Sequence, residues 1–173
     1  MNMKALLMLN IVAADILLAG CASDNRNKVA LDTVGPAPAQ TPAIGPSTNG
    51  NLAVYSAYRR TPDFDTRDPY RPEYSDYRIY NVDGKFLRNI HNDSGTFLQD
   101  PASVPLVPGK YRIVARANGF GFITVPILIE AGQSTVLHLE GGDPGVDASG
   151  FSQTNAVRLP DGQIVGWRSP AGS

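Results

Sequence analysis

Short apolar segments separated by turn dipeptides follow one another at regular intervals from Tyr77 onward. Each dipeptide contains glycine, which accepts the positive φ that tight turns require. The pairs are Asp83-Gly84, Pro108-Gly109, Asn118-Gly119 and Ala131-Gly132. For Pro108-Gly109 we predict a type II turn, because proline fixes one φ and glycine takes the positive one. Strands punctuated in this way are typical of an all-β domain, and we predict a β-sandwich.

The clearest predicted strand extends from Lys110 to Ala117, where apolar and charged residues alternate. Side chains of a strand point to opposite faces in turn, so one face is buried and the other faces solvent. The inward set is Tyr111, Ile113, Ala115 and Ala117, and the outward set is Lys110, Arg112 and Arg116.

Segments 123–129 and 134–140 repeat this alternation. We expect them to bury Ile123, Val125, Ile127, Ile129, Leu137 and Leu139. Pro126 has no N–H to give to a ladder, so it predicts an edge strand or a bulge. Other strands are predicted at 52–55, 77–82, 86–90, 96–98 and 103–106, and segments 156–159 and 163–167 predict a final hairpin.

One stretch of this region carries a family resemblance. Its elements are Leu106-Val107-Pro108-Gly109-Lys110-Tyr111, then Gly119-Phe120, Gly132 and Thr135-Val136-Leu137. Together they resemble the carboxypeptidase-regulatory-like and PEGA-type β-sandwich domains, over about residues 77–140. The resemblance implies an immunoglobulin-like or transthyretin-like sandwich that serves as an accessory or binding module, and it supplies no catalytic residues.

The N-terminal segment has the layout of a secretory signal. It carries Lys4 near its start, continues as an apolar run interrupted by Asn10 and Asp15, and ends at Leu18-Ala19-Gly20-Cys21. The run is shorter than the roughly 20 apolar residues that a membrane-spanning helix needs. We therefore predict a segment that directs export and is then removed.

Leu18-Ala19-Gly20-Cys21 resembles the lipobox of bacterial lipoproteins. The resemblance implies that residues 1–20 are cleaved off and that the sulfur of Cys21 carries a diacylglycerol. Because Ala22 rather than aspartate follows the cysteine, it also implies the outer membrane of a diderm bacterium. Asp15 departs from the pattern, since a charge at the centre of an apolar segment costs about 2–3 kcal/mol on insertion. The alternative is an ordinary cleaved signal or a buried helix with a chance cysteine.

Residues 21–50 are rich in Pro, Ala, Gly, Thr and Asn, and their prolines are too closely spaced for a helix. They predict a disordered tether with a root-mean-square span of roughly 30 Å. A proline-rich ligand for a partner is the alternative, but no PxxP motif with basic flanks is present. The predicted organisation is a signal peptide at 1–20, a tether at 21–50, a sandwich at 51–140 with its core at 77–140, and a loop with a hairpin at 141–173.

Residues 59–74 mix both signs of charge with aromatic residues and predict a long irregular loop. Asp63, Asp65 and Asp68 lack the glycine turn and the distal glutamate of a calcium loop, so we predict no metal site there. His91 and His138 are predicted to be surface polar groups. No G-x-S-x-G motif or metal-binding histidine pair accompanies them, and we expect neither an enzyme nor a bound cofactor.

The composition narrows the expected partners. A formal net charge of −1 gives no electrostatic case for nucleic acid. The sole cysteine is assigned to lipid, so the domain has no disulfide. We expect a lipid-anchored envelope protein that binds or adapts another envelope component, either a protein by strand addition along the Pro126 edge or a glycan on aromatic side chains. The alternative is a ligand-free structural spacer.

Aromatic residues provide the candidate partner-binding positions, which are Tyr55, Tyr58, Tyr70, Tyr74 and Trp167. Tyrosine is enriched at protein interfaces, although these tyrosines can equally pack the loop. Trp167 is the only tryptophan. We favour its packing against the sandwich, because a two-stranded hairpin needs support, over a role as an exposed binding aromatic.

Overall fold

The computed structural model describes residues 28–37, 48–62, 70–92, 100–141 and 150–169. The predicted signal peptide, Cys21, the aspartates at 63, 65 and 68, and the predicted strand at 96–98 lie outside these residues. The described part contains no helix, and none of its segments could cross a membrane as a long apolar helix. Its strands are β1 (Lys28–Val29), β2 (Gly50–Tyr55), β3 (Tyr58–Pro62), β4 (Tyr70–Tyr74), β5 (Tyr77–Asn81), β6 (Phe86–Ile90), β7 (Val104–Leu106), β8 (Gly109–Ala117), β9 (Gly121–Ile129), β10 (Ser134–His138), β11 (Ala156–Arg158) and β12 (Ile164–Arg168).

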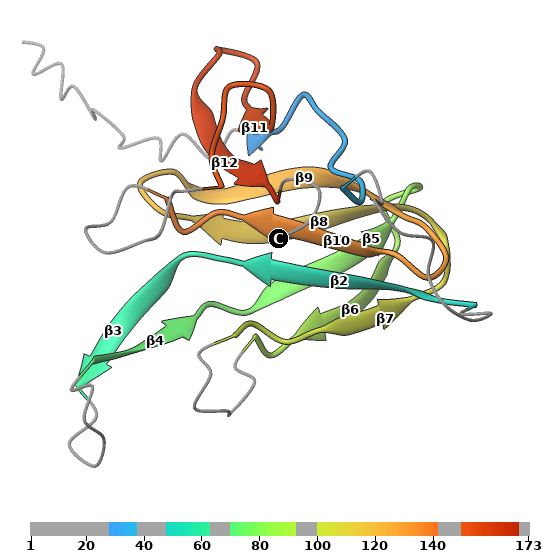
Figure 1. The fold of residues 1–173 in the computed structure, drawn as a ribbon, viewed down its shortest axis with the longest axis horizontal. Coiled ribbons are helices and arrows are strands. Elements are labelled where there is room, and N and C mark those ends of the chain that lie inside the picture. Colours follow the sequence, from blue (N-terminus) through green and yellow to red (C-terminus); the bar gives the residue numbers. More distant parts are fainter. Residues whose placement is uncertain (1–27, 38–47, 63–69, 93–99, 142–149, 170–173) are drawn as a thin grey trace, which may run out of the picture.

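Two five-stranded sheets pack face to face, which confirms the predicted all-β sandwich (Figure 1). The order in the first sheet, sheet A, is β1-β9-β8-β5-β6, and the order in the second, sheet B, is β11-β12-β10-β2-β7. The chain changes sheets repeatedly, so neighbouring strands of one sheet are often far apart in sequence. Both β1 with β9 and β2 with β10 pair in parallel.

The long hairpin β8–β9 is the centre of sheet A, and its alternation is as predicted. Ile113, Ala115 and Ala117 are buried while Lys110, Arg112 and Arg116 are exposed. Ile123, Val125, Ile127 and Ile129 are buried on β9, and Leu137 and Leu139 are buried on the segment of β10. These residues form one core with Leu52, Val54 and Ile79. Each large aliphatic side chain buried there stabilises the fold by about 1.5–3 kcal/mol.

The predicted tether is wrong for residues 28–34, because this segment completes the edge of sheet A. Ala30 N donates to Thr124 O, Val34 N donates to Pro126 O, and Leu128 N donates to Val34 O. Ala30 and Val34 are buried in the core. Residues 31–33 leave the ladder beside Pro126, whose missing N–H faces this side of β9. The proline therefore accommodates an irregular edge, and the chain's own N-terminal segment covers it.

Two other boundaries differ from the prediction. Residues 59–62 and 70–74, predicted as parts of an irregular loop, belong to the antiparallel pair β3–β4. The predicted core at 77–140 is too narrow, because β12 pairs with β10 and brings Val157 and Val165 into the same core. Both differences come from pairings with residues distant in sequence or across a loop, which local alternation does not reveal.

The predicted type II turn at Pro108-Gly109 is also wrong. Gly109 has φ 157° and is the first residue of β8. β7 belongs to sheet B and β8 to sheet A, so this dipeptide lies in a crossover between sheets and not in a hairpin. By contrast, Gly84 has φ 83° in the predicted tight turn between β5 and β6.

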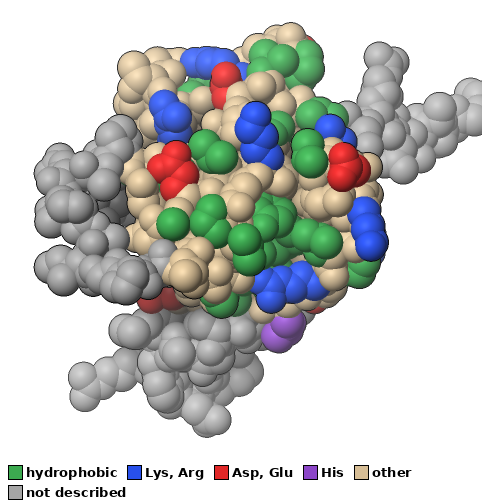
Figure 2. Space-filling view, turned by 90° about the vertical axis from the view of Figure 1, so that its right-hand side faces the viewer, with side chains coloured by type: hydrophobic (Ala, Val, Ile, Leu, Met, Phe, Trp, Pro, Cys, Tyr) green, Lys and Arg blue, Asp and Glu red, His purple; other side chains and the backbone are tan. Residues whose placement is uncertain are grey.

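The end of the sandwich with the β5–β6 and β9–β10 turns is partly apolar. Figure 2 views this end and shows hydrophobic side chains gathered between side chains of both charges. Val82, Phe86, Leu87 and Val107 are its exposed apolar residues. Asp83 and Glu130 contribute negative charge in the two turns.

Candidate functional site

An aromatic cluster of Tyr55, Tyr58, Tyr74, His138 and Trp167 covers the outer side of sheet B. Tyr55 and His138 stack with ring centroids 4.4 Å apart, and His138 and Trp167 stack at 4.8 Å with an interplanar angle of 2°. Cross-strand pairing of β10 with β2 and β12 produces this stack, because Tyr55, His138 and Trp167 are register partners. Tyr74 meets the edges of Tyr55 and Tyr58 at 5.6 and 5.7 Å.

His138 is the centre of the aromatic cluster, so its prediction as a surface polar group is wrong. Its Nδ1 donates to Glu140 Oε1 at 2.7 Å, and the Ser169 hydroxyl lies 2.9 Å from Nε2. The Glu140 side chain is only 7% exposed, and its Oε2 has no hydrogen-bond partner among the described residues. His91 does match its prediction, since its side chain is 77% exposed and pairs with Asp76. The cluster thus fixes one histidine from both ring nitrogens and both ring faces.

Burial and the Glu140 charge both act on the hydroxyl groups of Tyr55 and Tyr74. Burial, followed by the Glu140 carboxylate, raises the pKa of Tyr74 well above its ordinary value. Burial also raises the pKa of Tyr55, with Asp100 and then Glu140 adding to the effect. Both phenols are therefore neutral hydrogen-bonding groups at physiological pH, and neither is prepared to act as a base.

Trp167 packs against the sheet as favoured from the sequence, and it is 4% exposed. Phe151 meets its edge, and Gly141 lies against its six-membered ring. Of the candidate binding aromatics, Tyr55, Tyr58, Tyr74 and Trp167 are brought together, whereas the side chain of Tyr70 lies outside the described part. Cys21 lies outside it too. Binding by these residues stays a prediction.

His138 and Glu140 were missed as members of the cluster. The alternation of β10 did place His138 on the polar face, but its neighbours depend on which strands flank β10. Parallel pairing with β2 and antiparallel pairing with β12 join segments more than 25 residues apart, as the register His138↔Tyr55 and His138↔Trp167 shows. No local signal in the sequence specifies that register.

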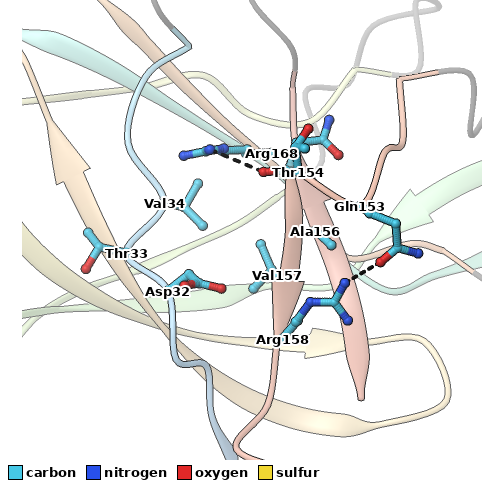
Figure 3. Close-up of a pocket in the computed structure, with 10 residues that line it drawn as sticks. Asp32, Thr33, Val34, Gln153, Thr154, Ala156, Val157, Arg158 and Arg168 are labelled. Atoms are coloured by element: carbon cyan, nitrogen blue, oxygen red, sulfur yellow. Dashed lines mark hydrogen bonds between the residues drawn. The ribbon is translucent and has the colours of Figure 1, made fainter. Parts of the chain in front are cut away.

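A cleft of about 230 Å³ lies between the N-terminal segment and the C-terminal hairpin (Figure 3). The N-terminal segment forms the first wall and the C-terminal hairpin forms the second. Val34 of the first wall and Val157 of the second face one another and form the apolar part of the lining. Asp32 comes from the first wall. Arg158 and Arg168 come from the second, where Arg158 donates to Gln153 Oε1 and Arg168 donates to Thr154 O at 3.4 Å. The cleft places both guanidinium groups beside a small polar space.

The contacts of β12 with the aromatic cluster determine that the side chain of Arg168 points into the cleft. Trp167 and Ser169 both contact His138, so they lie on the same face of β12. Alternation then projects Arg168, the residue between them, to the opposite face and into the cleft. A planar guanidinium with free N–H groups matches carboxylate and phosphate oxygens, so the arrangement suits an acidic group.

The described residues contain no grouping of three or more His, Cys, Asp or Glu side chains placed to hold a metal ion. A scan against protein-family models and searches of curated proteins and of solved structures found no match to the chain.

Proposed function

We propose that the chain is a lipid-anchored protein of the cell envelope whose sandwich is a non-catalytic binding module. Acyl chains on Cys21 hold it on the outer membrane of a diderm bacterium, after removal of residues 1–20. The lipobox resemblance at Leu18-Ala19-Gly20-Cys21 supports this anchor. One acyl chain gives marginal membrane binding, and more than one gives stable anchoring.

The cleft is the observation that carries the binding part of the proposal. Among the described residues its guanidinium groups have few competing partners: Arg168 makes a long 3.4 Å bond to a backbone carbonyl, and Arg158 donates to Gln153 and, at 3.4 Å, to Gly162 O. An acidic group of an envelope protein or glycan replaces these contacts with charge-assisted hydrogen bonds, which are roughly twice as strong as neutral ones. The partner is therefore an envelope component that presents a carboxylate or phosphate.

Two ways of binding a partner that were expected from the sequence are not part of the proposal. Strand addition along the Pro126 edge is not part of the proposal, because residues 28–34 already pair there. Stacking of a sugar on Trp167 is not part of it either, since His138 covers one ring face and the side chain is buried. The second candidate function is a ligand-free spacer, which the buried aromatic cluster also supports as a purely structural element.

Site-specific photo-crosslinking in growing cells separates the two functions. A photoreactive residue at Gln153, which is exposed on the rim of the cleft, is compared with one at Ser134, which is exposed on β10. Binding predicts a discrete adduct from position 153 that is absent from position 134. Arg158→Gln together with Arg168→Gln abolishes that adduct without changing the protein level. A spacer gives no discrete adduct at position 153 under several growth conditions.

A further inference from the structure

The strands of sheet A carry cations and no carboxylates. β1, β5, β6 and β8 contain lysine or arginine, β9 contains neither, and all five strands lack aspartate and glutamate. This is unexpected in a chain whose formal net charge is −1. The carboxylates therefore lie outside the strands of sheet A, and the charged side chains of these strands are all positive.

The register collects most of these cations on the outer face of sheet A. Residues directly opposite in an antiparallel pair share a face, and here Arg78 is opposite Val114, Arg112 opposite Tyr80, and Arg116 opposite Phe122. The exposed cations of this face are Arg78, Lys110, Arg112 and Arg116. We call this surface the basic face.

Exposed apolar side chains lie among these charges. Phe122 is 64% exposed with the guanidinium of Arg116 5.9 Å from its ring centroid, and Phe86 is 51% exposed. Val29 of β1, at 41% exposure, is the register partner of Thr124 on the same face. Cations with exposed aromatic and aliphatic side chains are the combination found where proteins meet lipid headgroups.

The described chain begins at the edge of this same sheet. Lys28, the first residue of β1, pairs with Ile123 next to the β8–β9 turn. Even fully extended, the chain from Cys21 to Lys28 reaches at most about 25 Å. A lipid anchor at Cys21 thus keeps sheet A close to the bilayer. The longer tether predicted from the sequence, residues 21–50, would allow a larger separation.

The described carboxylates lie outside the strands of sheet A, although Asp32 lines the cleft beside the edge of this sheet. Asp100 and Glu140 act on Tyr55 in the aromatic cluster outside sheet B, and Asp76 pairs with His91 beyond β4. Asp83 and Glu130 lie in the turns at the end remote from the β8–β9 turn. The charge distribution therefore favours an orientation in which the basic face of sheet A meets a negatively charged surface.

We propose that the basic face of sheet A docks on the anionic phospholipid surface of the membrane that holds the anchor. This inference rests on the proposed lipid anchor. Arg78, Lys110, Arg112 and Arg116 approach the headgroup phosphates, while Phe122 and Val29 enter the headgroup region. Each cation near an anionic bilayer contributes roughly fivefold to the docked-to-undocked ratio, so three arginines contribute roughly a hundredfold.

The test uses the acylated full chain in vesicles. Acylation leaves no free thiol, so a single introduced cysteine can carry a spin label. Asn89→Cys on β6 reports the basic face, because Asn89 is opposite Arg78, and Ser134→Cys on β10 reports sheet B. Accessibility to a water-soluble nickel complex is measured in phosphatidylglycerol–phosphatidylethanolamine vesicles and in phosphatidylcholine vesicles.

Docking predicts protection of the label at position 89, and not at position 134, in the anionic vesicles only. Combined Arg78→Gln, Arg112→Gln and Arg116→Gln restores accessibility, as does 1 M salt, which shortens the screening length from about 8 to about 3 Å. The matched double variant Arg158→Gln, Arg168→Gln leaves protection unchanged. Equal accessibility at both positions, or protection that persists in phosphatidylcholine or in the triple variant, overturns the docking. Failure of the chain to float with vesicles would instead overturn the anchor, and with it the docking.

Discussion

Gly166 is the position at which one added carbon should do most damage to the described fold. A Cβ at Gly166 would lie 2.0 Å from the backbone oxygen of His138, whereas real Cβ contacts essentially never fall below 3.0 Å. The obstacle is backbone, so β12 must move about 1 Å away from β10. That movement breaks the register pair of His138 with Trp167 and opens their ring stack. We expect Gly166→Ala to lower the free energy of unfolding by about 3 kcal/mol, near the upper end for overpacked sites.

Urea unfolding followed by far-UV circular dichroism measures this cost, and a thermal melt should show a midpoint lower by roughly 10 °C. Gly35→Ala is the matched control, because the atoms nearest to its Cβ would be side-chain atoms of Leu128 at 3.6 Å or more, which is an ordinary contact. The control should stay within about 0.5 kcal/mol of the wild type. The reasoning is refuted if Gly166→Ala unfolds like the wild type, or if both variants lose the same stability.

Three further predictions follow from individual side chains. Val34→Ser should cost about 2 kcal/mol in urea unfolding because Val34 is 1% exposed, whereas a residue in a free tether would cost nothing. The emission maximum of Trp167, the sole tryptophan, should be blue-shifted from that of the urea-unfolded chain, and coincidence of the two maxima would contradict its burial. Tyr77→Phe should raise stability by about 1 kcal/mol at pH 7, because the buried Tyr77 hydroxyl has no hydrogen-bond partner in the part of the chain that the structure describes. Burial raises the pKa of Tyr77 in the folded state, so the unfolded state ionises first and the free energy of unfolding falls as pH rises above about 10. Thermal midpoints from pH 8 to 12 should therefore fall less in Tyr77→Phe than in the wild type.

Local patterns were enough to predict the elements whose neighbours are adjacent in the chain. The β5–β6 turn at Gly84 and the β8–β9 hairpin with buried Ile113 and Val125 follow from period-two alternation and turn chemistry. Burial of Trp167 followed from the need of a short hairpin for support. In each case, the information lies within about ten residues.

Pairings between distant segments were not predictable in the same way. Residues 28–34 show no period-two alternation, because Val29, Ala30 and Leu31 are consecutive apolar residues, and they become a sheet edge only because β9 offers open backbone groups beside Pro126. The stack of Tyr55, His138 and Trp167 likewise depends on a register between three strands from different parts of the chain. Each of these three residues, taken alone, shows no local signal for packing in a cluster. The order and register of the strands bring their rings together.

The proposed function depends first on the lipid anchor at Cys21, and metabolic labelling with palmitate tests for this anchor. The chain is expressed in a diderm bacterium with labelled palmitate, purified, and compared with Cys21→Ser. An acylated Cys21 predicts label in the wild-type chain and none in the variant. Label retained in Cys21→Ser, or a wild-type chain without label, would contradict it.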